Sequence, residues 1–182
     1  VVRFFYNLLF PIVLLVLLPG FLIRMTRRGN YRHKFGQRFG IYSAGVREKL
    51  VSTNRVWIHA VSVGEVNIAL KLIQSLRDAD PELAFVLSTT TSTGFKLALS
   101  RKSAWLEPIY GPLDFYPIVR RVVRLIRPRC LILVEAEVWP NLVCEVRRSG
   151  AKTALVNARL SPRSEKRYRA VSWITAPIFN QL

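Results

Sequence analysis

Residues 56–65 read VWIHAVSVGE, and this stretch decides the fold of the chain. Its first part, Val56 to Val61, is an apolar run of strand-forming residues, and a Ser-x-Gly-Glu turn follows it. A helical pattern of apolar residues begins directly after Glu65. The stretch therefore predicts the first strand–turn–helix unit of an α/β domain, with the Glu65 carboxylate at the sheet edge where such domains bind ligands.

The same alternation of strand and helix patterns continues along the chain. Strands are expected at residues 56–61, 84–88, 105–110, 130–134 and 152–156. Helices are expected at residues 66–77, at 95–99, at 117–126 with Asp114 as the cap, and from residue 139 to Gly150. Short strands that are almost wholly apolar are typical of a parallel sheet buried on both faces. The predicted fold class is therefore α/β, with a Rossmann-like parallel sheet.

The chain carries a large positive charge. Its 28 lysines and arginines against 11 acidic residues give a formal net charge of +17. Such a charge attracts anionic partners, which include nucleic acids, anionic lipids and phosphorylated substrates. The basic residues do not form one helix interleaved with aromatic residues, and no RNA- or DNA-reading motif occurs. We therefore predict no nucleic-acid partner and favour a membrane surface.

The N-terminal segment has the composition of a membrane helix. Residues 4–23 contain no formally charged side chain, and a helix of that length is about 30 Å long, close to the thickness of a bilayer core. Pro11 and Pro19 would kink it. Basic residues crowd behind the segment, which favours an uncleaved anchor over a cleaved signal peptide and places the domain in the cytoplasm. We expect residues 1–24 to form a single-pass or deeply interfacial membrane helix.

Residues 25–54 are predicted to be a basic juxtamembrane linker, and residues 55–182 the folded domain. Four glycines interrupt any long helix in the linker. Two interpretations of its charge stay open. The linker is a solvated tether, or it grips the headgroups of anionic membrane lipids.

Polar residues follow four of the predicted strands at the points where the strands end. They are Ser62, Gly64 and Glu65; Thr89–Gly94, which includes Thr91, Thr93 and Gly94; Glu135 and Glu137; and Asn157 and Arg159. Because the carboxyl ends of parallel strands meet at one edge of a sheet, we expect these residues to converge into one site.

Glu65 and the other strand-end residues each have a functional and a structural interpretation. Glu65 at a helix start could accept a proton as a general base, but an acid there can equally do no more than stabilise the helix. Gly64 can be a glycine that a tight turn needs for positive φ. Glu135 and Glu137 point to one face, where they could bind a basic group or pair with Arg159.

Several common catalytic signatures are missing from the sequence. Residues 91–94 could present hydroxyl and N–H groups to a phosphate or a sugar, but no lysine follows them, so they do not form a Walker A loop. His59 lies inside a predicted strand and has no second ligand at metal spacing. Neither Gly-x-Ser-x-Gly nor Gly-x-Gly-x-x-Gly occurs. We therefore expect no metal and no cofactor.

Five motifs occur in a fixed order along the chain. They are His59-Ala60-x-Ser62-Val63-Gly64-Glu65, Thr89-x-Thr91-x-Thr93-Gly94, Pro112-Leu113-Asp114, Glu135-x-Glu137-x-Trp139-Pro140-Asn141 and Asn157-Ala158-Arg159-Leu160-Ser161. In order and spacing this set resembles the N-terminal half of 3-deoxy-D-manno-octulosonic acid (Kdo) transferases. The resemblance covers roughly the whole chain, including the apolar and basic N-terminal segments.

The resemblance implies the acceptor-binding half of a GT-B glycosyltransferase at the cytoplasmic face of the bacterial inner membrane. Such enzymes transfer Kdo from CMP-Kdo to a phosphorylated lipid A precursor during lipopolysaccharide synthesis. It also implies that Glu65 is the catalytic base and that Glu137 supports the site. We expect Ser62, Gly64 and Glu135 to support the site as well. Acceptor or phosphate binding is expected from Thr91, Thr93, Gly94, Asn157 and Arg159, and lipid-phosphate binding from basic residues between Arg24 and Arg38, Arg159 and Arg163.

The resemblance also implies a second Rossmann-like domain that binds the CMP-sugar. This chain stops at Leu182, before such a domain, so we expect no transferase activity from these residues alone. Two alternatives stay open: the acceptor domain of another GT-B glycosyltransferase, and a non-catalytic membrane module that binds anionic lipid.

Overall fold

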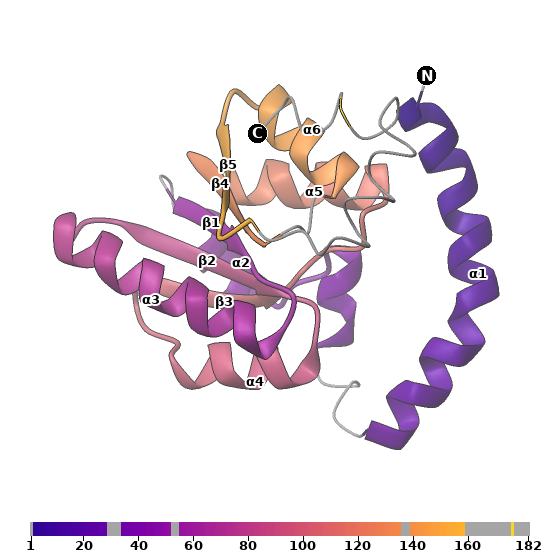
Figure 1. The fold of residues 1–182 in the computed structure, drawn as a ribbon, viewed down its shortest axis with the longest axis horizontal. Helices are drawn as coiled ribbons and strands as arrows, with labels where there is room; N and C mark the ends of the chain where they lie inside the picture. The colour runs from indigo at the N-terminus through magenta and orange to yellow at the C-terminus, as the bar shows by residue number, and fades with distance from the viewer. Residues whose placement is uncertain (1, 29–33, 52–54, 136–138, 159–175, 177–182) are drawn as a thin grey trace.

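The computed structural model describes residues 2–28, 34–51, 55–135, 139–158 and 176 (Figure 1). Its centre is a five-stranded sheet in the order β3-β2-β1-β4-β5. The strands are β1 Arg55–His59, β2 Ala84–Thr89, β3 Leu106–Tyr110, β4 Cys130–Val134 and β5 Lys152–Val156. All four pairings between neighbouring strands are parallel. The predicted α/β class with a Rossmann-like parallel sheet is therefore confirmed.

Helices cover both faces of the sheet. Their bounds are α1 Val2–Arg28, the 3-10 helix η1 Phe35–Phe39, α2 Ala44–Val51, α3 Val63–Ala79, α4 Ser92–Ser100, α5 Tyr116–Ile126 and α6 Pro140–Arg148. α3 and α4 pack on one face, and α2, α5 and α6 pack on the other. The chain runs from β1 through β2 to β3 towards one edge of the sheet, and from β4 to β5 towards the other edge. Because the crossover connections between parallel strands are right-handed, opposite directions place the connecting helices on opposite faces. The reversal between β1 and β4 is the position where such sheets bind ligands.

α3 begins earlier than predicted. It starts at Val63, three residues before the expected start, because the Ser62 side chain caps it. Glu65 is therefore the third residue of the helix and lies inside its first turn. This places the carboxylate against the backbone of the preceding loop.

Asp114 caps a different helix from the one predicted. The residue before α5 is Phe115, whose side chain makes no capping hydrogen bond. The Asp114 carboxylate instead accepts hydrogen bonds from the backbone N–H groups of Asn141, at 3.0 Å, and Leu142, at 2.9 Å. It also bonds the Tyr6 hydroxyl of α1. Asp114 thus fixes the first turn of α6 and connects it to α1.

Part of the segment expected as a linker belongs to the core. α2 buries Val46 and Leu50, and Tyr42 packs in the same cluster as the buried faces of α5 and α6. Arg38 of η1 is only 4% exposed, so the prediction that it holds lipid phosphates is wrong. The physical reason for the burial of this segment is that it packs over one face of the sheet together with α5 and α6.

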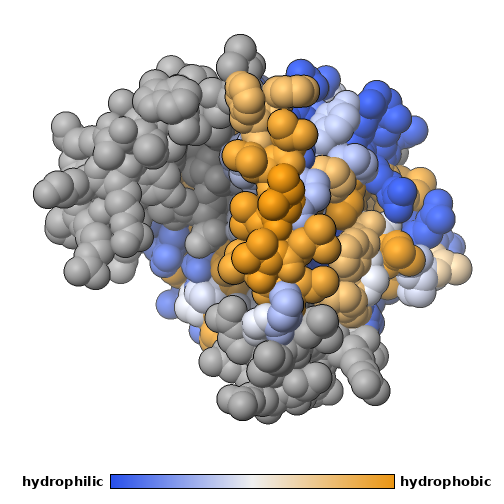
Figure 2. Space-filling view, turned by 90° about the vertical axis from the view of Figure 1, so that its right-hand side faces the viewer, coloured by the Kyte–Doolittle hydropathy of each residue, from blue (hydrophilic) through white to orange (hydrophobic). Residues whose placement is uncertain are grey.

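α1 stands beside the carboxyl edge of the sheet and keeps an apolar surface exposed (Figure 1). It continues through Pro11 and Pro19 without a break. Figure 2 shows the apolar surface of α1 as a stripe. The exposed large apolar residues of this helix are Phe4, Phe5, Leu8, Leu9, Ile12, Val13, Leu15, Val16 and Leu17. By length and composition, α1 could cross a membrane.

Polar side chains fix the first turns of α1 to the body. The Arg3 guanidinium donates to Asn141 Oδ1 at 2.8 Å and forms an ion pair with Glu145. Asn7 Oδ1 accepts hydrogen bonds from the Tyr116 N–H at 3.0 Å and from Asn141 Nδ2 at 2.9 Å. We call these five residues, Arg3, Asn7, Tyr116, Asn141 and Glu145, the polar clasp. The clasp joins α1 to the starts of both α5 and α6.

The clasp predicts that Asn7→Ala loosens the start of α5. The substitution leaves the Tyr116 N–H without its acceptor, which costs about 1–3 kcal/mol, while Asn141 Nδ2 keeps its second acceptor, the Asp114 backbone oxygen. We expect amide hydrogen exchange at Tyr116 to accelerate about tenfold or more. Asn67→Ala, at an exposed position of α3, is the matched control and should leave that exchange unchanged. Equal exchange in both variants would contradict a role for the clasp.

Candidate functional site

One carbonyl group joins the loops after β1 and β2. The Val61 oxygen accepts hydrogen bonds from Thr89 Oγ1 at 3.2 Å, from Thr91 Oγ1 at 3.0 Å and from the Thr91 N–H at 3.2 Å. The chain after β1 is therefore tied to the chain after β2. Two of the four predicted strand-end clusters come together, as the parallel topology requires.

Both oxygens of the Glu65 carboxylate accept hydrogen bonds from the backbone. Oε2 accepts the Val61 N–H at 2.8 Å and Oε1 accepts the Ser62 N–H at 3.1 Å, while Ser62 Oγ accepts the Glu65 N–H at 3.3 Å. This is a reciprocal capping box. Glu65 is 5% exposed. Because a carboxylate offers about four lone-pair positions, two remain for a hydroxyl group of a ligand.

α4 starts with a similar cap. Thr91 Oγ1 accepts the Gly94 N–H at 3.1 Å. Gly94 has no room for a side chain, because a Cβ there would lie 2.7 Å from Thr89 Oγ1 and 2.8 Å from Thr91 Oγ1. Thr93 is exposed in the first turn. Thr91 and Gly94 therefore shape the loop, and Thr93 is the member of this cluster that is open to solvent.

Gly64 lies in the first turn of α3. Positive φ among the described glycines occurs at Gly40 and Gly150, so the alternative that Gly64 supplies a positive φ is wrong. A Cβ at Gly64 would meet only Ser62 Oγ, at 3.8 Å, among the described residues. Because Gly64 has no side chain and is exposed, the backbone of this turn is accessible from solvent.

The clusters after β4 and β5 are described only in part. Glu135 is half-buried, and its N–H donates to the Val156 oxygen at 2.9 Å. Glu135 and Asn157 both adopt positive φ, 61° and 52°, so each strand ends in a sharp turn. Glu137 and Arg159 lie outside the described residues, as does Arg163. The convergence of these two clusters with Glu65, and a pairing with Arg159, stay predictions.

η1 brings two side chains to the carboxyl edge that the sequence analysis did not place there. Arg38 Nη2 donates to the Thr90 oxygen at 2.6 Å, and its guanidinium carbon lies 4.4 Å from the centre of the Tyr110 ring. Gln37 Oε1 accepts the Tyr110 N–H at 2.9 Å. These contacts tie the basic segment to the ends of β2 and β3. The sequence signal was weak, because no strand or helix pattern marks residues 37 and 38.

His59 is a buried residue at the end of β1. Its Nδ1 lies 2.7 Å from Ser88 Oγ, which also accepts the Trp57 indole N–H at 2.7 Å. Gly111 leaves room for the ring, since a Cβ there would lie 2.8 Å from His59 Cε1. Burial lowers the pKa of His59 to about 4, so the ring is neutral near pH 7. No group of three His, Cys, Asp or Glu side chains in the described part of the chain could hold a metal ion.

The pKa of the buried Asp114 carboxyl is raised, whereas that of His59 is lowered. Burial raises its pKa to about 6, although the N–H groups of Asn141 and Leu142, the Tyr6 hydroxyl and the charge of Arg3 all favour the ionised form. Desolvation therefore outweighs four favourable contacts. Ionised Asp114 is a source of instability that the fold tolerates near neutral pH.

Asp114 and His59 predict opposite pH dependences of the unfolding free energy between about pH 4 and pH 6. Folding raises the pKa of Asp114, so its contribution is lost as pH rises towards 6. Folding lowers the pKa of His59, so its contribution is lost as pH falls towards 4. Asp114→Asn should make the slope of stability against pH more positive, and His59→Gln more negative, each by up to about 1.4 kcal/mol per pH unit.

Urea unfolding at several pH values in this range measures both slopes relative to the unsubstituted chain. The comparison of slopes is insensitive to any constant destabilisation that either substitution causes. Slopes that shift in the same direction, or that do not shift, would contradict the assignment.

The chain is similar to known proteins over most of its length. The sequence model of one family, described as 3-Deoxy-D-manno-octulosonic-acid transferase (kdotransferase), matches residues 33–182. A 3-deoxy-D-manno-octulosonic acid transferase of Bordetella pertussis is 38% identical over 162 residues, which are 83% of this chain and 35% of that protein. The enzyme of the same name from Haemophilus influenzae is 29% identical over 180 residues, which are 99% of this chain and 42% of that protein.

A third relative carries a different name. A bifunctional glycosyltransferase/methyltransferase of Fusobacterium nucleatum is 31% identical over 129 residues, which are 70% of this chain and 20% of that protein. The chain thus spans about two fifths or less of the length of these relatives. The family match covers most of the chain, the α/β sheet and all five motifs. The chain belongs to the 3-deoxy-D-manno-octulosonic acid transferase family.

Proposed function

We propose that this chain is the acceptor-binding half of a Kdo transferase that moves Kdo from CMP-Kdo to a phosphorylated lipid A precursor. The donor CMP-Kdo would be held by a second Rossmann-like domain that these residues do not supply. In this proposal the chain alone is inactive and needs no metal or other cofactor. The enzyme would work at the cytoplasmic face of the bacterial inner membrane, in contact with anionic lipids.

The position of Glu65 carries the proposal. Its carboxylate lies at the carboxyl edge of β1, in the first turn of α3, next to a glycine that leaves the turn open. Two backbone N–H groups hold it in one orientation, and lone pairs remain to accept the proton of an acceptor hydroxyl. The hydroxyl oxygen would then attack the anomeric carbon of the donor sugar, and the cytidine phosphate would leave with the bonding electron pair.

The anchor and the charge support an acceptor embedded in a membrane. α1 exposes an apolar stripe, and the chain has a net charge of +17. A phosphorylated lipid presents apolar chains and negative charge together, so both features suit it. Ser62, Gly64 and Glu135 are proposed to support the Glu65 site.

Two other functions have an observation in their favour. The bifunctional relative suggests the acceptor domain of another GT-B glycosyltransferase, with a different sugar. The capping box gives Glu65 a complete structural role, which suits a non-catalytic module that binds anionic lipid. The experiment below separates the second of these from the enzyme.

Glu65→Gln is the test, made in a chain completed with a donor-binding domain. An amide cannot accept a proton from the acceptor hydroxyl, so we expect turnover of CMP-Kdo to fall by a factor of about 10²–10⁴. The capping box would weaken as well, by about 0.5–2 kcal/mol of unfolding free energy. Binding of the lipid acceptor should be retained.

Glu82→Gln serves as the matched control, because Glu82 is exposed between α3 and β2. This variant should keep both turnover and stability. Turnover of folded Glu65→Gln within tenfold of the unsubstituted enzyme would exclude Glu65 as the base. Turnover of CMP-Kdo by residues 1–182 alone would overturn the need for a second domain.

A further inference from the structure

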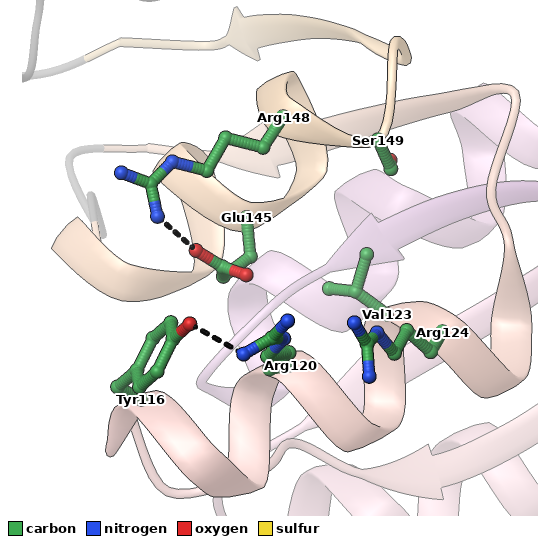
Figure 3. A pocket seen from close by; sticks show the side chains of 7 residues that line it. All are labelled: Tyr116, Arg120, Val123, Arg124, Glu145, Arg148 and Ser149. Atoms are coloured by element: carbon green, nitrogen blue, oxygen red, sulfur yellow. Dashed lines mark hydrogen bonds and ion pairs between the residues drawn. The ribbon is translucent and has the colours of Figure 1, made fainter.

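A groove of about 250 Å³ lies between α5 and α6 (Figure 3). Tyr116, Arg120 and Arg124 line it from α5, and Glu145 and Arg148 line it from α6. Its volume is below the range of about 300–1,000 Å³ that is usual for small-molecule sites. The groove therefore suits a small charged group rather than a whole sugar nucleotide.

Positive charge in the groove exceeds negative charge. Glu145 is its one acidic lining residue, and that carboxylate is already shared by Arg3 and by Arg148, whose Nη1 lies 3.1 Å from Oε1. Arg120 and Arg124 lie one turn apart on α5, and no ion pair within the described ranges involves either one. Like charges four residues apart destabilise a helix. An anion between these two guanidinium groups would remove that repulsion.

Tyr116 orients one arginine of the groove, Arg120, and the neighbouring Arg3. Arg120 Nη1 donates to the Tyr116 hydroxyl at 2.8 Å, and its guanidinium carbon lies 5.6 Å from the centre of the Tyr116 ring. The Arg3 guanidinium lies 5.0 Å from the centre of the same ring. A guanidinium group held in this way binds a pair of phosphate oxygens with little loss of side-chain entropy. The chemistry of the groove is therefore that of a phosphate site.

We propose that this groove binds the phosphate group of an anionic membrane phospholipid. The inference rests on the membrane association proposed above. The lipid source follows from the neighbouring surface: Arg3 touches two groove residues, and the next residues of α1, Phe4 and Phe5, are 67% and 54% exposed. A phosphate in the groove would thus lie beside the apolar stripe of α1, as a lipid phosphate lies beside its acyl chains.

The test compares two double variants that lose the same charge. Arg120→Gln with Arg124→Gln removes the two groove cations that form no ion pair with a described residue. Lys71→Gln with Arg101→Gln removes two exposed cations on α3 and at the end of α4, on the opposite face of the sheet. Co-sedimentation of the full chain with phosphatidylcholine vesicles, with and without phosphatidylglycerol, gives the affinities.

We expect the groove variant to lose about tenfold or more in affinity for the vesicles that contain phosphatidylglycerol, and the control less than about threefold. Inorganic phosphate should release the chain no better than sodium chloride of equal ionic strength. Equal losses of affinity in both variants would show that the groove arginines act only through general charge attraction, which would overturn the proposal. Preferential release by inorganic phosphate would assign the groove to soluble phosphate instead.

The same assay separates this inference from the function on which it rests. If the unsubstituted chain does not bind the anionic vesicles, both the groove and the membrane association are excluded. If it binds and the groove variant binds equally well, only the groove is excluded. Neither result bears on the Glu65→Gln experiment, which reads turnover.

Discussion

The buried carboxylate of Asp114 is the constraint on which the arrangement of helices depends. It accepts hydrogen bonds from the first two free N–H groups of α6, bonds the Tyr6 hydroxyl of α1 and lies in the loop from β3 to α5. Two helices from distant parts of the chain, α1 and α6, therefore meet at one acidic side chain, two residues before α5 begins. Burial raises its pKa to about 6, so the fold accepts an electrostatic cost near neutral pH in exchange for this junction.

The carboxyl edge combines structural and chemical demands on the same residues. Glu65 stabilises the first turn of α3 and is also the acid best placed among the described strand ends to meet an acceptor hydroxyl. The Val61 carbonyl plays a similar part, because three hydrogen bonds to it hold the loops after β1 and β2 together. A general base needs a fixed orientation more than it needs exposure. The capping box supplies that orientation, so the structural role of Glu65 does not argue against the proposed catalytic one.

Local patterns predicted the sheet well, whereas contacts between distant residues could not be predicted. The apolar strands and the glycine and proline boundaries gave the five strands in the right order along the chain, and the parallel topology brought Glu65 and Thr91 to one edge. The prediction that Asp114 caps α5 was wrong. The residue caps α6 instead, and a cap supplied by a residue 27 positions away leaves no periodic signal in the sequence. The burial of Arg38 was missed for a similar reason: its contacts with Thr90 and Tyr110 depend on tertiary packing.

The clasp limits how α1 can meet a bilayer. Its first turns are bound to α5 and α6, and a chain of six residue steps, at most about 22 Å, connects Arg28 to Lys34, which lies over the Phe95 ring on the body. This helix is about 40 Å long, and both of its ends are thus tethered to the same body. A helix held at both ends can lie in the membrane surface but cannot cross the bilayer until the clasp opens. In the clasped state, the membrane association proposed above would be monotopic, with α1 lying in the surface beside the carboxyl edge of the sheet.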